Sequence, residues 1–138
     1  MPRPFHLAFP VTDLVETKKF YTEILGCSTG RSSDKWIDFN FYGHQVVAHL
    51  SPDDCQQKQT NVVDGKNVPA AHWGVILDRK DWDELADRLK SHNIKFIIEP
   101  YIRFEGDAGE QATMFFLDPS GNALEFKAFK NDDQIFSV

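Results

Sequence analysis

Cysteine is scarce in this chain, which has only Cys27 and Cys55, without Cys-x-x-Cys spacing. Two such thiols cannot build a disulfide framework, so we expect reduced cysteines and a cytoplasmic protein. The sequence also has no apolar stretch near the roughly 20 residues that a bilayer span requires, and no secretory leader. These absences argue against an exported or membrane protein.

An excess of basic residues is missing too, because 15 Lys and Arg face 21 Asp and Glu, for a net charge of -6. Nucleic acids and anionic membranes are bound through positive surfaces that neutralise phosphates. We therefore expect neither of them as a partner, and a small molecule instead.

Apolar residues, in contrast, are plentiful enough for a core. The 138 residues are 41% hydrophobic and include 12 Phe. A chain of this size forms one domain by default, here residues 1–138.

The first half opens with the pattern of a strand followed by a helix. Phe5–Phe9 is a short apolar run that stops at Pro10, which lacks the amide hydrogen that a sheet ladder needs. Asp13 and Glu16 have capping-box spacing and start an amphipathic pattern that ends at Gly26.

The second half repeats this order, with a strand at Ala71–Leu77 and a capping box at Asp81–Glu84 that opens a helix. This helix fades near His92–Asn93, and a turn is expected at Asp118–Gly121. The remaining predicted strands of both halves are 36–42 and 45–50 around a turn at Gly43–His44, 96–98 ending at Pro100, 112–117 and 123–127.

The repeat divides the domain into two modules, residues 4–50 and 70–128, because each half alone would leave one sheet face uncovered. We expect the segment 51–69 to be the linker between them, because it is rich in Gln, Asn and Asp and has no helical period. Residues 129–138 are predicted to be a C-terminal tail. A long loop at Glu99–Gln111 is a candidate functional segment, since unusually long loops in compact domains are often functional.

Strand alternation puts three possible metal ligands on the side of the sheet away from the helices. His6 has the opposite parity to Leu7 and Phe9, and the same count separates His72 and Glu125 from their apolar neighbours. Two imidazoles and one carboxylate form the facial set typical of non-haem Fe(II), and they also suit Mn, Zn, Ni or Co. The alternative is that these residues are exposed strand histidines and a solvated glutamate.

The residues around these positions resemble a known superfamily. The segments Phe5–Asp13, Ala71–Leu77 and above all Phe116–Phe126, FLDPSGNALEF, are similar to the vicinal oxygen chelate superfamily of glyoxalases, bleomycin resistance proteins and extradiol dioxygenases. The resemblance covers residues 4–128 and is greatest to small predicted extradiol-type dioxygenases. It implies an α+β fold of two paired βαβββ modules, whose curved mixed sheet forms a cup around one divalent metal, with the helices on the outer face.

The same resemblance assigns the metal to His6, His72 and Glu125, with Fe(II) expected first. It also matches His49 to a histidine that acts as acid or base beside dioxygen. Parity puts His49 on the cavity side, and both a role as fourth ligand and a purely structural role stay open. His44, at the turn, is a weaker candidate for either role.

Six residues are predicted to contact the substrate. Phe115 stands where the extradiol pattern has a tyrosine, and an apolar ring there suits stacking on a ring or an alkyl group. Arg103 and Tyr101 would meet a substrate carboxylate, although a loop arginine more commonly bridges surface carboxylates. The other three share one parity within a predicted strand and are Trp36, Asp38 and Asn40.

These features favour a metal-dependent enzyme acting on a small molecule with two neighbouring oxygens, most concretely an extradiol-type dioxygenase with dioxygen as co-substrate. Two alternatives stay open, namely a glyoxalase-like isomerase or lyase on the same metal and a metal-free binding protein of the bleomycin-resistance type. The fold alone does not choose among them. A homodimer is expected, because dimers are common on this scaffold.

Overall fold

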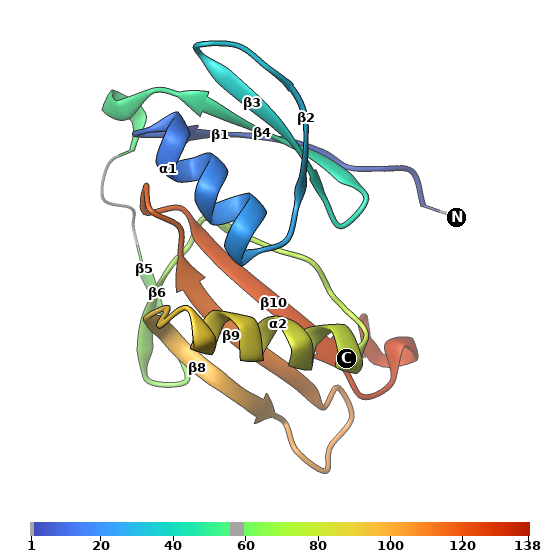
Figure 1. The fold of residues 1–138 in the computed structure, drawn as a ribbon. Helices are drawn as coiled ribbons and strands as arrows, with labels where there is room; N and C mark the ends of the chain where they lie inside the picture. Colours follow the sequence, from blue (N-terminus) through green and yellow to red (C-terminus); the bar gives the residue numbers. More distant parts are fainter. Residues whose placement is uncertain (1, 56–59) are drawn as a thin grey trace. The chain divides into compact units, whose positions relative to one another are not determined.

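The computed structural model describes residues 2–55 and 60–138, and its α+β architecture consists of two compact units (Figure 1). One unit is Met1–Gln57 with Asp118–Asn122, and the other is Lys58–Leu117 with Ala123–Val138. Each unit has a four-stranded sheet with a helix on one face. The predicted repeat of a strand, a helix and three strands is therefore confirmed within each unit.

In the first unit the strand order is β1-β4-β3-β2, with β1 parallel to β4 and the other neighbours antiparallel. Its elements are β1 (His6–Val11), α1 (Leu14–Lys19), β2 (Ser28–Ser32), β3 (Trp36–Phe41), β4 (His44–Leu50) and a 3₁₀ turn (Pro52–Asp54). Asp13 caps α1 as predicted, since its side chain accepts a hydrogen bond from the Glu16 amide (2.8 Å). α1 continues into a π-helical turn at Phe20–Ile24.

Alternate residues of this sheet are buried against the helix. The fully buried ring of Tyr21 lies 5.5 Å from the ring of Phe9 and 5.1 Å from that of Phe39. Each large apolar side chain buried in this way contributes about 2 kcal/mol. The face that packs on α1 is thus occupied by rings, and polar residues of the same strands take the other face.

The second unit repeats the topology with the order β7-β10-β9-β8, in which β7 is parallel to β10. Its elements are β5 (Thr60–Val63), β6 (Lys66–Pro69), β7 (His72–Trp73), α2 (Arg79–Ser91), β8 (Phe96–Arg103), β9 (Gln111–Leu117), β10 (Ala123–Phe129) and a 3₁₀ turn (Asp132–Gln134). α2 lies across one face of the sheet (Figure 1), and Trp82 Nε1 donates to the carbonyl of Phe126 (2.9 Å). The rings of Phe116 and Phe126 stack 5.9 Å apart in the core of this unit.

Three predicted boundaries are wrong. α2 begins at Arg79 instead of at Asp81, which lies in its first turn, where a negative charge still complements the helix dipole. β1 continues through Pro10, and β8 continues through Pro100. Both are end strands of their sheets, where a residue without an amide hydrogen removes no ladder bond.

Within the predicted linker 51–69, the structure has two strands that the sequence analysis did not identify. β5 and β6 pair antiparallel around Asp64–Gly65, whose φ values of 49° and 78° suit a two-residue hairpin turn. An Asp-Gly pair between two apolar runs is a strong hairpin signal, and the prediction missed it. Residues 56–59 of the predicted linker lie outside the described residues.

Further differences concern a turn, a strand and the C-terminus. The first hairpin turns at Tyr42–Gly43, one residue earlier than predicted. The predicted strand Ala71–Leu77 is reduced to the two residues of β7 and a single bridge between Ile76 and Lys127. The predicted tail instead begins with the end of β10 and continues into a 3₁₀ turn. In the described part of the chain, no helix has the length and apolar character to cross a membrane.

Candidate metal centre

One face of the first sheet collects the predicted site residues of the first unit. The strand register pairs His6 with Gln45 and then Gln45 with Asn40 across three strands. Residues two apart along a strand share a face, so the next rows add further side chains to this side. We call it the His6 face, and its members are His6, Ala8, Trp36, Asp38, Asn40, Gln45, Val47 and His49.

His6 is oriented by the neighbouring strand. Its Nδ1 lies 2.8 Å from Oε1 of Gln45, which is its register partner on β4. An amide oxygen only accepts hydrogen bonds, so Nδ1 carries a proton, and in a neutral ring Nε2 then has the lone pair. His6 is exposed. Nε2 is therefore the atom that His6 offers to a cation.

His49 lies on the His6 face and is exposed, but the register separates it from His6. It is four residues beyond Gln45 on β4, about 13 Å along the strand. Side chains stand roughly perpendicular to a sheet, so this spacing disfavours one ion held by both imidazoles. The predicted role of His49 in proton transfer stays a prediction.

The other polar residues of this region have different tasks. The Asn40 side chain accepts a hydrogen bond from the Gly43 amide (2.7 Å) and so closes the hairpin turn. His44 Nδ1 accepts from the Phe5 amide (2.8 Å), which is a structural role. Asp38 and Trp36 are half-buried, and a cavity of about 610 Å³ is lined by Asp38 and Asn40 among others.

The second unit brings His72 and Glu125 together. His72 Nε2 lies 3.4 Å from Glu125 Oε1, and His72 Nδ1 lies 2.9 Å from the carbonyl oxygen of Pro69. Because a carbonyl only accepts, Nδ1 carries the proton, and Nε2 of a neutral ring turns its lone pair toward the carboxylate. A cation between these two electron-rich atoms, either a proton on the ring or a metal ion, stabilises this approach.

The chemistry and spacing of this pair fit a metal ion. Two ligand atoms that each lie about 2.1 Å from a tetrahedral ion are about 3.4 Å apart, which is the separation of His72 Nε2 and Glu125 Oε1. A histidine ligand also characteristically donates its other ring nitrogen to a carbonyl or carboxylate. Pro69 supplies that carbonyl to His72, and Gln45 supplies an amide oxygen to His6.

Close approach of β7 to β10 brings His72 beside Glu125. The two strands pair in parallel with His72 opposite Ala123. A Cβ atom on Gly74 would lie 1.6 Å from the backbone oxygen of Glu125, which is a severe steric clash between non-bonded atoms. Only glycine at position 74 therefore permits this spacing.

Phe115 supports His72 from the core. It is 2% exposed, and its ring meets the imidazole of His72 edge-on, with centroids 4.9 Å apart. Val68 of β6 and Ile98 of β8 belong to the same buried cluster. The sequence suggested that Phe115 would stack on substrate, whereas the structure buries its ring against a proposed ligand.

Tyr101 and Arg103 both bind Asp64 at the tip of the β5–β6 hairpin. The Tyr101 hydroxyl donates to the Asp64 carboxylate, and Arg103 Nε lies 2.9 Å from Asp64 Oδ2. Burial raises the pKa of Tyr101, and its hydrogen bond to Asp64 raises it further. The alternative reading of Arg103, a bridge to a surface carboxylate, is therefore the one that the structure supports.

The turn before β10 is tied to the first unit's helix. Asp118 is buried and accepts from the Tyr21 hydroxyl (2.8 Å), the Ser120 amide (2.9 Å) and the Asn122 amide (2.8 Å). The Asn122 side chain in turn donates to the carbonyl of Pro10 (2.8 Å). Burial raises the pKa of Asp118. The pKa of Tyr21 is raised well above its ordinary value by burial and by the nearby charge of Asp118. The predicted turn 118–121, which precedes the proposed ligand Glu125, is therefore fixed by polar contacts to Tyr21 and Pro10.

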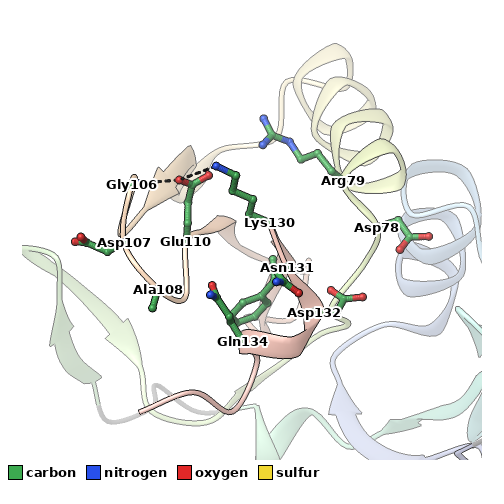
Figure 2. Close-up of a pocket in the computed structure, with 11 residues that line it drawn as sticks. Asp78, Arg79, Gly106, Asp107, Ala108, Glu110, Lys130, Asn131, Asp132 and Gln134 are labelled. Carbon is green, nitrogen blue, oxygen red and sulfur yellow. Dashed lines mark hydrogen bonds and ion pairs between the residues drawn. The ribbon is translucent and has the colours of Figure 1, made fainter.

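The second unit contains several cavities, and two of them concern predicted residues. One, of about 190 Å³, is lined by His72, Glu125 and the half-buried Lys127. A larger one, of about 840 Å³, lies between the start of α2 and the end of β10 (Figure 2). There Glu110 accepts a hydrogen bond from the Gly106 amide (2.8 Å), and its carboxylate lies 3.9 Å from Lys130 Nζ. The first contact joins two residues of the predicted functional loop, and the second joins this loop to the residue after β10.

The structure thus brings together two of the three predicted ligands, His72 and Glu125, while His6 belongs to the other unit. Within the described residues of either unit, no three His, Cys, Asp or Glu side chains form a metal-binding group. The complete trio stays a prediction. Sequence reasoning missed four contributors to the region, which are Pro69, Gly74, Thr113 and Lys127.

Comparison with known proteins places the chain in context. The family model described as Glyoxalase/Bleomycin resistance protein/Dioxygenase superfamily matches residues 3–126. A solved glyoxalase/bleomycin resistance protein/dioxygenase from Alicyclobacillus acidocaldarius is 36% identical, with 96% of each chain covered and a TM-score of 0.79.

Two more distant structures share the fold. The genomically encoded fosfomycin resistance protein FosX from Listeria monocytogenes is 19% identical, with 97% of this chain and 98% of that chain covered and a TM-score of 0.72. A lactoylglutathione lyase from Agrobacterium tumefaciens is 16% identical, with 90% of this chain and 91% of that chain covered and a TM-score of 0.64. At these identities the likeness concerns the fold alone.

Proposed function

Because the chain belongs to the glyoxalase/bleomycin resistance protein/dioxygenase superfamily, we propose that it is a metal-dependent enzyme acting on a small molecule with two neighbouring oxygens. The observation that carries the proposal is the separation of 3.4 Å between His72 Nε2 and Glu125 Oε1. His6, whose Nδ1 lies 2.8 Å from Gln45 Oε1 and whose Nε2 has the lone pair in a neutral ring, is the proposed third ligand. Fe(II) is the first candidate metal, and Mn, Zn, Ni or Co are the alternatives.

The residues around the pair have separate proposed roles. A divalent ion bound there would act as a Lewis acid and lower the pKa of a substrate hydroxyl. Lys127 lines the same cavity as His72 and Glu125, and its positive charge favours a substrate that carries an anionic oxygen. His49 is proposed to transfer a proton to or from the substrate.

Two reactions are candidates on this site. Ring cleavage of the extradiol type, with dioxygen as co-substrate, is the reaction proposed from the sequence. A glyoxalase-like isomerisation or lysis is the second candidate, and a specific observation favours it. The residue that stands in place of the extradiol tyrosine, Phe115, is buried against His72 and has almost no exposed surface.

Metal content tests the proposal directly. Protein purified without chelator and analysed for elements is expected to carry about one divalent ion per chain, whereas His6→Ala, His72→Ala and Glu125→Gln lose it. His92→Ala and Glu99→Gln are matched controls, because both residues are exposed and lie outside the proposed site. Equal metal content in the wild type and the three ligand variants would favour the metal-free binding protein instead.

Oxygen consumption then separates the two reactions. Uptake of dioxygen with a panel of catechols, lost in His49→Gln while metal content is retained, supports ring cleavage. Turnover of an α-hydroxy or α-keto substrate without oxygen uptake supports the isomerase or lyase.

A further inference from the structure

Thr113 touches Glu125, although no sequence pattern singles it out. Its Oγ1 lies 2.7 Å from Glu125 Oε2 and must be the donor, since a carboxylate oxygen only accepts. Thr113 is 2% exposed, so water does not compete for this hydrogen bond. The register pairs Phe115 with Glu125 and Thr113 with Lys127, which makes Thr113 a diagonal neighbour on the same face of the sheet.

The hydrogen bond distinguishes the two oxygens of the carboxylate. Oε2 is engaged by Thr113, whereas Oε1 faces His72 Nε2 at 3.4 Å. His72 is oriented by the Pro69 carbonyl at Nδ1 and by an edge-on contact with the Phe115 ring. The pair is therefore preorganised to offer one nitrogen and one oxygen.

We propose that Thr113 is a positioning residue that makes Glu125 a ligand through Oε1 alone. The inference rests on the proposed function, because it concerns how the metal is held. The last torsion of a glutamate side chain is broad and has no strong rotamer preference. Without the Thr113 hydroxyl, the carboxylate can rotate and present both oxygens, which occupies a position that substrate needs, or it can turn Oε1 away from His72.

Thr113→Val tests this role, because it removes the hydroxyl and preserves the branched shape. Thr113→Ser retains a hydroxyl and is the matched control. Each protein is stripped of metal and titrated with Co²⁺, with both the dissociation constant and the visible d–d spectrum recorded. Loss of a side chain that orients a ligand typically weakens metal binding 10–100-fold. We expect that loss, with a changed band intensity, in Thr113→Val, and a spectrum close to wild type in Thr113→Ser.

The outcomes separate this inference from the proposed function. If wild type binds Co²⁺, Glu125→Gln does not, and Thr113→Val matches wild type in affinity and spectrum, the positioning role is overturned and the metal site stands. If wild type and Glu125→Gln both fail to bind, the proposed function falls and the inference falls with it. Thermal melting of the metal-free proteins identifies a folding defect. Should Thr113→Val not fold, Thr113→Ala carries the same expectation, since it also lacks the hydroxyl and adds no bulk.

Discussion

The two units have sheets of the same topology, yet different residues occupy the equivalent positions. In the first unit His6 pairs with Gln45, and in the second His72 pairs with Ala123. Two residues further along the longer partner strand, the first unit has Val47 and the second has Glu125. The histidine is common to both halves, whereas the carboxylate is present in one. The register therefore makes Val47, and not His49, the counterpart of the proposed ligand glutamate.

A second contrast concerns how the two faces are covered. Asp38 pairs with Val47 as Phe115 pairs with Glu125, so these two residues are also counterparts. Asp38 is half-buried and lines a cavity, while Phe115 is buried in a cluster with Val68 of the β5–β6 hairpin. In the second unit apolar residues pack against the proposed ligand His72, and in the first unit polar groups lie on the same face as His6. Duplicated modules can thus divide support and recognition between them.

The largest effect is expected from adding a methyl group at position 74, compared with removing one at the equivalent position 8. Gly74→Ala would place a Cβ 1.6 Å from the Glu125 backbone oxygen, so β7 and β10 must separate. We expect a loss of about 3 kcal/mol or more in the free energy of unfolding, measured in urea, with loss of Co²⁺ binding. The equivalent position of the first unit already carries Ala8, and Ala8→Gly is expected to change stability by less than about 1 kcal/mol. Similar small effects at both positions would contradict the tight approach in the second unit.

Each unit has one aromatic side chain whose polar atom makes a buried hydrogen bond, and only one of the two bonds is expected to depend on pH. Tyr21→Phe and Trp82→Phe each remove one buried hydrogen bond, to Asp118 and to the Phe126 carbonyl, and each is expected to lower stability by about 1–3 kcal/mol. Because burial raises the pKa of Tyr21, the unfolded chain loses that proton above pH 10 while the folded protein keeps it. Stability due to Tyr21 is therefore complete below pH 10 and is lost as the pH rises.

Denaturation curves between pH 8 and pH 11 measure this difference. The gap between wild type and Tyr21→Phe is expected to narrow above pH 10, by up to about 1.4 kcal/mol per pH unit. The gap for Trp82→Phe is expected to stay constant, because indole does not titrate in this range. A constant gap for both variants would show that Tyr21 ionises as it does in the unfolded chain.

The smallest expected effect concerns the hairpin that covers only the second unit's face. Asp64→Ala removes the partner of Tyr101 and Arg103 at a partly exposed site, so we expect a loss of about 0.5–1 kcal/mol. Hydrogen exchange is expected to quicken at amides of Thr60–Pro69 and to stay unchanged in β1 and β4. Unchanged exchange in the hairpin would mean that burial of Val68 holds it without Asp64.

Several elements were predictable because their signals are local. The Asp13 cap, the positive φ of Gly26 and the alternation that exposes His6 and buries Phe9 depend on neighbours within a few residues. The end-strand position of Pro10 was not predictable, since it depends on which strands pair. The hairpin at Asp64–Gly65 had a local signal that a broader reading of the polar segment obscured.

The sequence by itself determined the repeated order of elements, the faces of His6, His72 and Glu125, and membership of a family. Periodicity and capping act over short spans, so they can be recognised without coordinates. Only the tertiary structure decided that Thr113 donates a hydrogen bond to Glu125 and that the Pro69 carbonyl orients His72. It also decided that the lack of a side chain at Gly74 allows β7 to approach the backbone of Glu125. Those contacts join strands that are distant along the chain or pass through backbone atoms, and neither leaves a pattern in the order of side chains.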